Sequence, residues 1–194
     1  MARKSSGGTK SRIVDAAWKL FYEQGYEGTT VEDIVALSGT SKGSFYHYFA
    51  SKDDLVGSMA YLFDEKYEEL AAALDPQVPA LEALLYLNRE LFLMIENRID
   101  IALLTRLLST QLTLQGSKQL LDHNRVYFKL LRRIITDGRQ RGELTEALTV
   151  SEMVRLYAMT ERAMLYEWCL RGGDYALSDY AARTLPLLLS SLKK

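Results

Sequence analysis

Apolar residues along this chain recur at the spacing of helices rather than of strands. The first apolar stripe, at spacings i, i+3, i+4, i+7 and i+8, consists of Ile13, Ala16, Ala17, Leu20 and Phe21. Strand-like alternation of apolar and polar residues is absent over any useful length. The pattern therefore predicts an all-α fold. Its first helix should end at Gly25, because glycine readily adopts the left-handed backbone of a helix terminus.

Two short helices separated by a glycine turn should follow. Thr30 and Asp33 have the spacing of an N-terminal capping pair, and an apolar stripe comes directly after them. Gly39 should end this helix, and Ser41 can cap the next one. On that next helix we expect an inward face made of Phe45, Tyr48 and Phe49.

A longer fourth helix is predicted from the repeat of the capping spacing at Ser51 and Asp54, and its apolar residues continue toward Asp75. Beyond it, the periodicity predicts helices at about 79–97, 100–114, 117–141, 150–171 and 177–192. Pro186 should kink or break the last of these.

Composition narrows the class of protein. The 194 residues are 48% hydrophobic and 25% charged, as expected of a chain that folds around a core, and the net charge is −1. Anion binding must therefore be local, and residues 1–8 begin a basic N-terminal stretch that reads as a flexible arm. A single cysteine, the absence of an export signal and the absence of a long apolar run favour a cytoplasmic protein without membrane contact.

Residues 30–49 have the order short helix, glycine turn, short helix, which is the layout of a helix-turn-helix. Ordinary helical hairpins share this layout, so the pattern alone leaves DNA binding open. The residue string is more specific and consists of the first apolar stripe, Gly25, Tyr26, Thr29, Thr30, Val31, Ile34, residues 39–49, Ser51, Lys52 and Leu55.

With these residues, the first third of the chain closely resembles the DNA-binding domain of the TetR family of transcriptional regulators. The turn Ser38-Gly39-Thr40 departs from the alanine, glycine and valine more usual in that family but keeps its glycine. The resemblance implies a three-helix DNA-binding domain at 9–55, with a recognition helix at about 41–49. A long helix would join it to a helical ligand-binding and dimerisation domain at 56–194.

Candidate DNA contacts follow from the resemblance together with helix geometry. Gly43 and Ser44 are small residues near a helix N-terminus, which lets the backbone approach the bases, while Tyr46 and His47 should point away from the core. Lys52 resembles the family's phosphate-contacting lysine. The complete set is Thr30, Ser41, Lys42, Gly43, Ser44, Tyr46, His47 and Lys52.

The C-terminal two thirds resembles the family mainly in architecture. Aromatic residues and polar residues within apolar helices are candidates for lining an effector pocket, although such aromatic residues are more often simply core and the polar ones can lie on the surface. They are Phe63, Tyr67, Asn88, Phe92, Arg106, Gln111, His123, Tyr127 and Tyr157. The last two predicted helices are rich in Leu, Met and Ala, as expected of a homodimer interface.

Catalysis and metal binding find little support. Residues 39–43 match the G-x-S-x-G pattern of hydrolases, but that motif needs a preceding strand where this chain has a helix. Two histidines and one cysteine lack zinc-ligand spacing. We expect no catalytic residue, no metal and no cofactor.

The sequence thus predicts a ligand-responsive regulator, most simply a repressor that a small molecule releases from double-stranded, pseudo-palindromic operator DNA. The alternative is a helical small-molecule-binding module or enzyme without sequence-specific DNA binding. The effector, the operator sequence and the choice between repression and activation stay open at this point.

Overall fold

The computed structural model describes residues 8–113 and 118–194, and these form α-helices and short 3-10 turns. Within those ranges there is no β-strand, only an isolated bridge between Leu144 and Lys193. The predicted all-α class is confirmed. The predicted arm at 1–8 lies outside the described residues except for Gly8.

The described chain divides into two compact units, unit 1 with residues 8–59 and 102–113, and unit 2 with residues 60–101 and 118–194.

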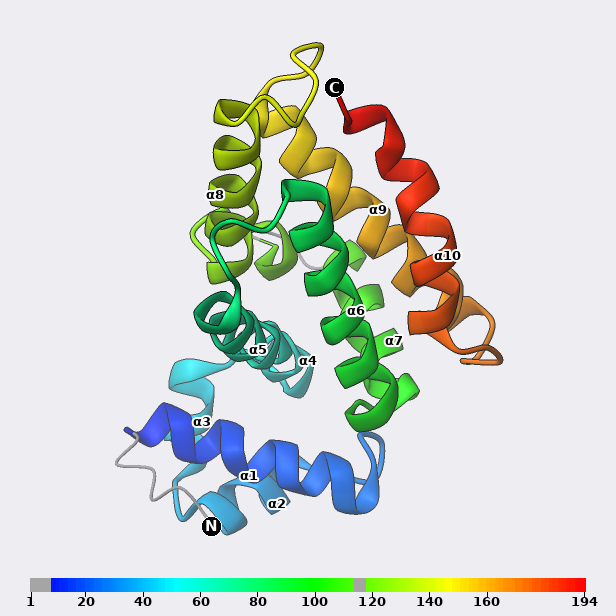
Figure 1. The fold of residues 1–194 in the computed structure, drawn as a ribbon. Helices are drawn as coiled ribbons and strands as arrows, with labels where there is room; N and C mark the ends of the chain where they lie inside the picture. Colours follow the sequence, from blue (N-terminus) through cyan, green and yellow to red (C-terminus); the bar gives the residue numbers. More distant parts are fainter. Residues whose placement is uncertain (1–7, 114–117) are drawn as a thin grey trace. The chain divides into compact units, whose positions relative to one another are not determined.

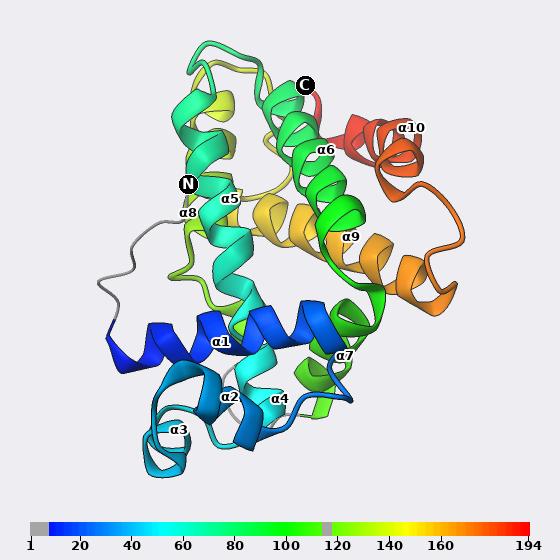
Figure 2. The same ribbon diagram turned by 90° about the horizontal axis from the view of Figure 1, so that it is seen from below.

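Unit 1 is built from α1 (Thr9–Gln24), α2 (Val31–Ser38), α3 (Lys42–Tyr48), α4 (Lys52–Val56) and nearly all of α7 (Ile101–Thr113). Helix α1 lies against both α2 and α3 (Figure 2). The core of unit 1 includes the fully buried side chains Ile13, Phe21, Ile34, Phe45 and Leu55. Trp18 of α1 is also buried, and its indole N–H donates to Ser58 Oγ at 3.1 Å.

The ends of α2 and α3 are fixed by the local bonds that the sequence predicts. Thr30 Oγ1 accepts from the Asp33 N–H at 3.1 Å, and the Asp33 carboxylate accepts from the Thr30 N–H at 2.9 Å. Gly39 then takes a φ of 60°. Ser41 Oγ accepts from the Ser44 N–H at 3.0 Å. The capping box, the glycine turn and the serine cap are therefore all confirmed.

The predicted fourth helix differs from the structure, which has two helices in its place. Helix α4 ends at Val56, and α5 (Met59–Ala73) begins after Gly57 and Ser58. The N–H groups of Gly57 and Ser58 donate to Asp54 and Leu55, three residues back, at 3.1 and 2.9 Å. These tighter bonds replace the four-residue spacing of an α-helix and interrupt it.

Unit 2 contains α5 from residue 60 onward, α6 (Ala80–Arg98), α8 (Val126–Gln140), α9 (Val150–Leu170), α10 (Leu177–Leu189) and the short turns Gln119–Leu121 and Ser190–Leu192. Helix α6 packs against α8 and α10, and α9 packs against the same two helices (Figure 1). A Cβ at Gly138 of α8 would lie 2.4 Å from the Cβ of Ala80, so these helices meet where neither can carry a larger side chain.

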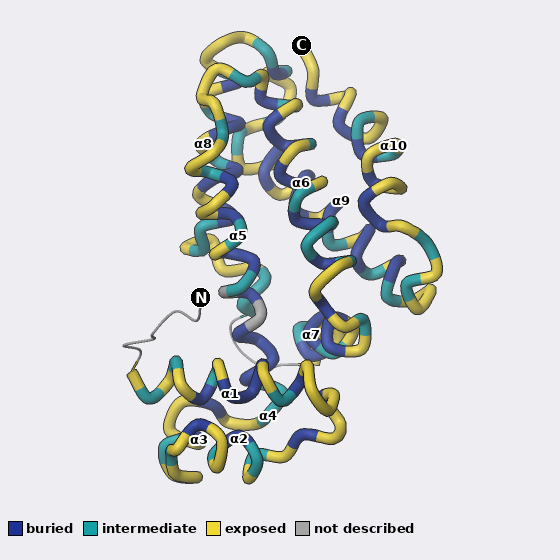
Figure 3. The backbone as a smooth tube through the Cα atoms, turned by 60° about the horizontal axis from the view of Figure 1, so that its bottom comes forward, coloured by how far each residue is buried: buried dark blue, intermediate teal, exposed yellow. Residues whose placement is uncertain are grey.

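The predicted helices at 79–97, 100–114, 150–171 and 177–192 match α6, α7, α9 and α10. The helix predicted at 117–141 starts later, at Val126, because a 3-10 turn and a hydrogen-bonded loop occupy the described residues before it. Pro186 lies inside α10, which continues through it. Buried and exposed stretches alternate along α10 (Figure 3).

Candidate DNA-binding and effector sites

The outward face of α3 carries most of the residues predicted to touch DNA. Lys42, Gly43, Tyr46 and His47 are exposed, and Ser44 is half-buried beside its cap. The inward face consists of Phe45 and Phe49, which are buried as expected, whereas Tyr48 is 40% exposed. The prediction that Tyr48 faces the core is wrong, because its ring turns outward onto that of His47, with centroids 4.8 Å apart. Aromatic and basic groups thus stand together on one accessible face.

Gly43 has no packing reason to be a glycine. A Cβ built at this position would meet only Ser41 Oγ, at 3.7 Å, which is an ordinary contact, and Gly43 is not among the glycines with a positive φ. A glycine that its own fold does not require is explained if another molecule approaches the helix closely at that point.

Lys42 forms an ion pair with Glu32 of α2 at the edge of this face. Both side chains are about 60% exposed. The hydrogen bond from Lys42 lowers the pKa of Glu32. A DNA phosphate at this position would therefore compete with a neighbouring carboxylate for the Lys42 ammonium.

Lys52, the first residue of α4, turns toward the protein. Its ammonium donates to the carbonyl oxygens of Tyr26 and Thr29 at 2.7 and 2.8 Å and stands 3.9 Å from the centroid of the Tyr26 ring. Burial lowers the pKa of Lys52. Two of its three hydrogens are thus directed at internal acceptors, and one is left for a further partner.

Thr30 and Ser41 are exposed residues that also cap helices. Their hydroxyl oxygens accept from Asp33 and Ser44, so each has a structural role without DNA. Both stand at helix N-termini, where free N–H groups favour an anion.

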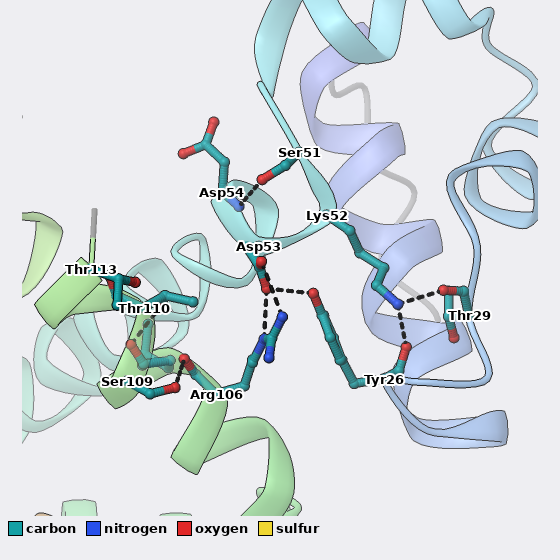
Figure 4. Close-up of polar contacts among 11 residues, drawn as sticks. Tyr26, Thr29, Ser51, Lys52, Asp53, Asp54, Arg106, Ser109, Thr110 and Thr113 are labelled. Carbon is teal, nitrogen blue, oxygen red and sulfur yellow. Dashed lines mark hydrogen bonds and ion pairs between the residues drawn. The ribbon is translucent and has the colours of Figure 1, made fainter. Parts of the chain in front are cut away.

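Arg106 and Gln111 are two predicted effector residues that lie on α7, in unit 1. Arg106 forms a two-pronged ion pair with Asp53 of α4, with Nε to Oδ1 at 2.7 Å and Nη2 to Oδ2 at 3.1 Å (Figure 4). Gln111 is half-buried near the end of the same helix. Both residues belong to unit 1, whereas the other predicted effector residues belong to unit 2.

In unit 2, four predicted effector residues, one from each of four helices, lie around a buried carboxyl that was not among the residues predicted from the sequence. Glu161 of α9 accepts from the Tyr127 hydroxyl at 2.5 Å and from Asn88 Nδ2 at 2.8 Å. The ring of Tyr67 packs on that of Tyr127, with centroids 4.9 Å apart. On α9, one turn before Glu161, Tyr157 is fully buried and donates to the Leu84 carbonyl at 2.7 Å.

Glu161 is 3% exposed, and burial raises its pKa, although the hydrogen bond from Tyr127 acts in the opposite direction. A signal for its burial was present in the sequence. Glu161 falls at helical spacing within the apolar stripe of α9, which consists of Met153, Val154, Tyr157, Ala158, Met164, Leu165 and Trp168.

The other candidates of unit 2 are scattered. Phe63 and Phe92 are buried, whereas His123 is exposed and packs on Phe128 with ring centroids 4.7 Å apart. Two surface pockets of 430 and 220 Å³ lie in this unit, the first around Asp64 and Arg125 and the second around Asp75 and Arg133. None of the predicted effector residues lines either pocket.

Among residues 8–113 and 118–194, no group of three or more acidic, histidine or cysteine side chains has the arrangement of a metal site. Over the same part of the chain, no helix combines the length and the apolar character needed to cross a membrane.

Comparison with known proteins covers both units. Residues 13–59 match the family described as bacterial regulatory proteins, tetR family, and residues 59–191 match the family described as YsiA-like protein, C-terminal region. The fatty acid metabolism regulator protein of Bacillus subtilis is 27% identical over 93% of this chain and 94% of its own length. The repressor KstR2 of Rhodococcus jostii is 38% identical over 43% of each chain.

Two solved structures have folds similar to that of this chain. The regulator FadR of Bacillus subtilis in complex with stearoyl-CoA is 26% identical, with a TM-score of 0.68 over 94% of this chain and 98% of that one. The repressor FadR of Thermus thermophilus in complex with lauroyl-CoA is 22% identical, with a TM-score of 0.76 over 94% of each chain. Two adjoining family matches that span residues 13–191, on a helical fold with an N-terminal helix-turn-helix, show that this chain belongs to the TetR family of DNA-binding transcriptional regulators.

Proposed function

We propose that this chain is a homodimeric repressor that binds a pseudo-palindromic operator through α3 and is released from it by a fatty acyl-CoA. The observation that carries DNA binding is the exposed face of α3, where Lys42, Tyr46 and His47 surround a glycine that the fold does not require. A two-fold dimer presents two such faces, so the two half-sites of its operator mirror each other. Its place of action is the cytoplasm, where the operator lies.

The proposed DNA contacts are of two kinds: some residues bind phosphates and position the protein on DNA, and others read the base sequence. Thr30, Ser41 and Lys52 stand at helix N-termini and hold phosphates, Lys52 through the hydrogen that its carbonyl partners leave over. Gly43 permits close approach, and Tyr46 adds contact area beside the backbone. Sequence is read by Lys42, Ser44 and His47 on the accessible side of α3.

The effector class is proposed from the C-terminal part of the chain. Similarity to the Bacillus subtilis fatty acid regulator extends over 93% of the chain, and the FadR structure from that organism holds stearoyl-CoA. The apolar interior of unit 2, with Phe63 and Phe92, suits an acyl chain. Residues 56–194 are accordingly assigned to effector binding and dimerisation.

The dimer interface is proposed on α9 and α10. These helices expose apolar side chains that unit 2 does not cover, namely Met159, Leu170, Leu187 and Leu188. Leu170 and Leu187 are more than 70% exposed. A second copy of the same helices would bury them, since contiguous exposed apolar surface marks an interaction site.

The test uses full-length protein and DNA from beside its own gene. Footprinting should show one symmetric protected block, and fluorescence anisotropy should show that stearoyl-CoA or lauroyl-CoA weakens binding by about 5- to 150-fold. Free coenzyme A and stearate serve as controls and should leave binding unchanged. If the dimer bound no DNA selectively, the chain would act instead as a helical ligand-binding module. If DNA bound but neither acyl-CoA released it, the effector class would be wrong.

A further inference from the structure

The backbone carbonyl and the phenolic hydroxyl of Tyr26 bond to the first two residues of α4, Lys52 and Asp53. Tyr26 lies between α1 and α2, and its carbonyl oxygen accepts from the Lys52 ammonium at 2.7 Å. Its phenolic hydroxyl donates to Asp53 Oδ1 at 2.5 Å (Figure 4). The helix-turn-helix occupies the residues between these two points. The segment that enters it and the segment that leaves it are therefore bonded to each other through one tyrosine.

Arg106 joins α7 to the same point. Its guanidinium makes the two-pronged pair with Asp53 and lies 5.1 Å from the centroid of the Tyr26 ring. A planar guanidinium matches a carboxylate in direction as well as in charge, so the pair fixes orientation. Burial opposes ionisation of Asp53, but the hydrogen bonds from Arg106 and Tyr26 outweigh it and lower the pKa of this carboxyl.

The ion pair between Arg106 and Asp53 is too exposed to contribute much to the stability of the fold. The side chains of Arg106 and Asp53 are 42% and 37% exposed, and ion pairs of that exposure stabilise a fold little. What the pair does define is the position of α7 relative to both ends of the helix-turn-helix. Only Ile99 and Asp100 separate α7 from α6 of unit 2, so α7 follows that helix directly in the chain.

We propose that Arg106 is a positioning residue for operator binding, which acts through Asp53 and Tyr26 to hold the helix-turn-helix in its DNA-competent arrangement. For its regulatory step this inference rests on the proposed function. A change in α6 on effector binding reaches α7 through the chain, and Arg106 passes it to Asp53. An effector that favours a displaced α7 then lowers operator affinity by linkage.

The first experiment measures operator affinity without any effector for Arg106→Gln, Asp53→Asn and the double variant. Each single variant should bind the footprinted operator about 5- to 20-fold more weakly, and the double variant no more weakly than either, because both remove one interaction. Tyr26→Phe, which deletes only the hydroxyl, should show a smaller loss in the same direction. Lys129→Gln, an exposed charge on α8, is the control and should bind normally.

Salt titration separates positioning from direct contact. If Arg106 positions the helices, Arg106→Gln loses affinity for the operator while non-specific DNA binding and the salt slope are unchanged. If Arg106 touches a phosphate, both affinities fall and the slope drops by about one, and the proposal is wrong. Additive losses in the single and double variants would also overturn it. Arg106→Lys, which keeps the charge without the planar fork, should recover only part of the operator affinity.

The regulatory step is tested with stearoyl-CoA as the probe. Wild-type protein should lose operator affinity on its addition, and Arg106→Gln should lose clearly less, since its coupling is already broken. An equal loss in both would contradict the regulatory step. If the wild type does not respond, the proposed effector class fails, and the measurements without effector still decide whether Arg106 positions the operator-binding helices.

Discussion

Tyr127 donates its phenolic hydrogen to Glu161 over 2.5 Å in the interior of unit 2, between α8 and α9. Tyr127 and Asn88, which donate hydrogen bonds to this carboxyl, are neutral groups. Burial penalises the charged form of this acid and raises its pKa, and the hydrogen bonds that it accepts offset only part of that effect.

Stability should consequently depend on pH through Glu161. Its pKa in the folded protein is raised above the ordinary value of 4.5, so its contribution is fully present below that value and is lost as the pH rises through the raised pKa. Glu161→Gln should therefore unfold at a higher denaturant concentration than wild type at alkaline pH, with a smaller difference in acid. Denaturant titrations at several pH values measure this. Equal pH dependence in the two proteins would contradict it, and Tyr127→Phe should enlarge the dependence.

Gly43→Ala should weaken DNA binding without lowering the stability of the fold. The added methyl group meets only an ordinary contact, and alanine favours a helix over glycine by about 0.5–1 kcal/mol, less in the first turn. The variant should be as stable as wild type or slightly more so, yet bind the operator at least about 10-fold more weakly, a loss of about 1.4 kcal/mol. Thermal unfolding and anisotropy measure the two effects. Undiminished DNA binding would remove the argument for close approach at this residue.

Glu32→Gln should tighten DNA binding. The change frees Lys42 from its carboxylate partner and removes a negative charge beside the DNA-facing surface. Affinity should rise, and the salt slope should steepen by about one if Lys42 then takes up a phosphate. Glu69→Gln, which breaks the pair between the exposed Glu69 and the half-buried Lys66 on α5, is the control and should leave DNA binding unchanged. An equal gain in both variants would show only a change in net charge.

Leu187→Glu should disrupt the proposed dimer without unfolding the protomer. The side chain is 73% exposed in the single chain, so a carboxylate there is solvated in the monomer and desolvated in a dimer. Sedimentation should shift toward the monomer, and operator binding should weaken at least about 10-fold because two linked recognition helices become independent. A variant that sediments as a dimer would exclude this surface of α10 from the interface.

The sequence could predict those parts of the fold that local chemistry decides. Thr30 with Asp33, Gly39 and Ser41 determine the ends of α2 and α3 through bonds within a few residues, and each was found as expected. The interruption at Gly57 was not foreseen. Ser58 is held there by Trp18, a residue distant in sequence, and periodicity does not report such a bond.

In the candidate sites, too, some features follow from local sequence and others depend on tertiary packing. Helical geometry correctly placed Tyr46 and His47 on an exposed face. A polar residue within an apolar helix can face a core, a pocket or another helix, and the choice depends on tertiary packing. Asn88 therefore proved to bond to Glu161, whereas Arg106, selected by the same reasoning, bonds to Asp53 of α4.

The bond from Trp18 to Ser58 also gives the molecule a spectroscopic reporter. The chain has two tryptophans, and each compact unit contains one of them, buried and hydrogen-bonded, since Trp168 donates to the Tyr175 carbonyl at 2.9 Å. With Trp168→Phe the fluorescence follows unit 1 alone, and with Trp18→Phe it follows unit 2. Coincident melting curves from the two proteins would mean that unit 1 and unit 2 share one cooperative transition, so that a ligand of either unit protects both from unfolding.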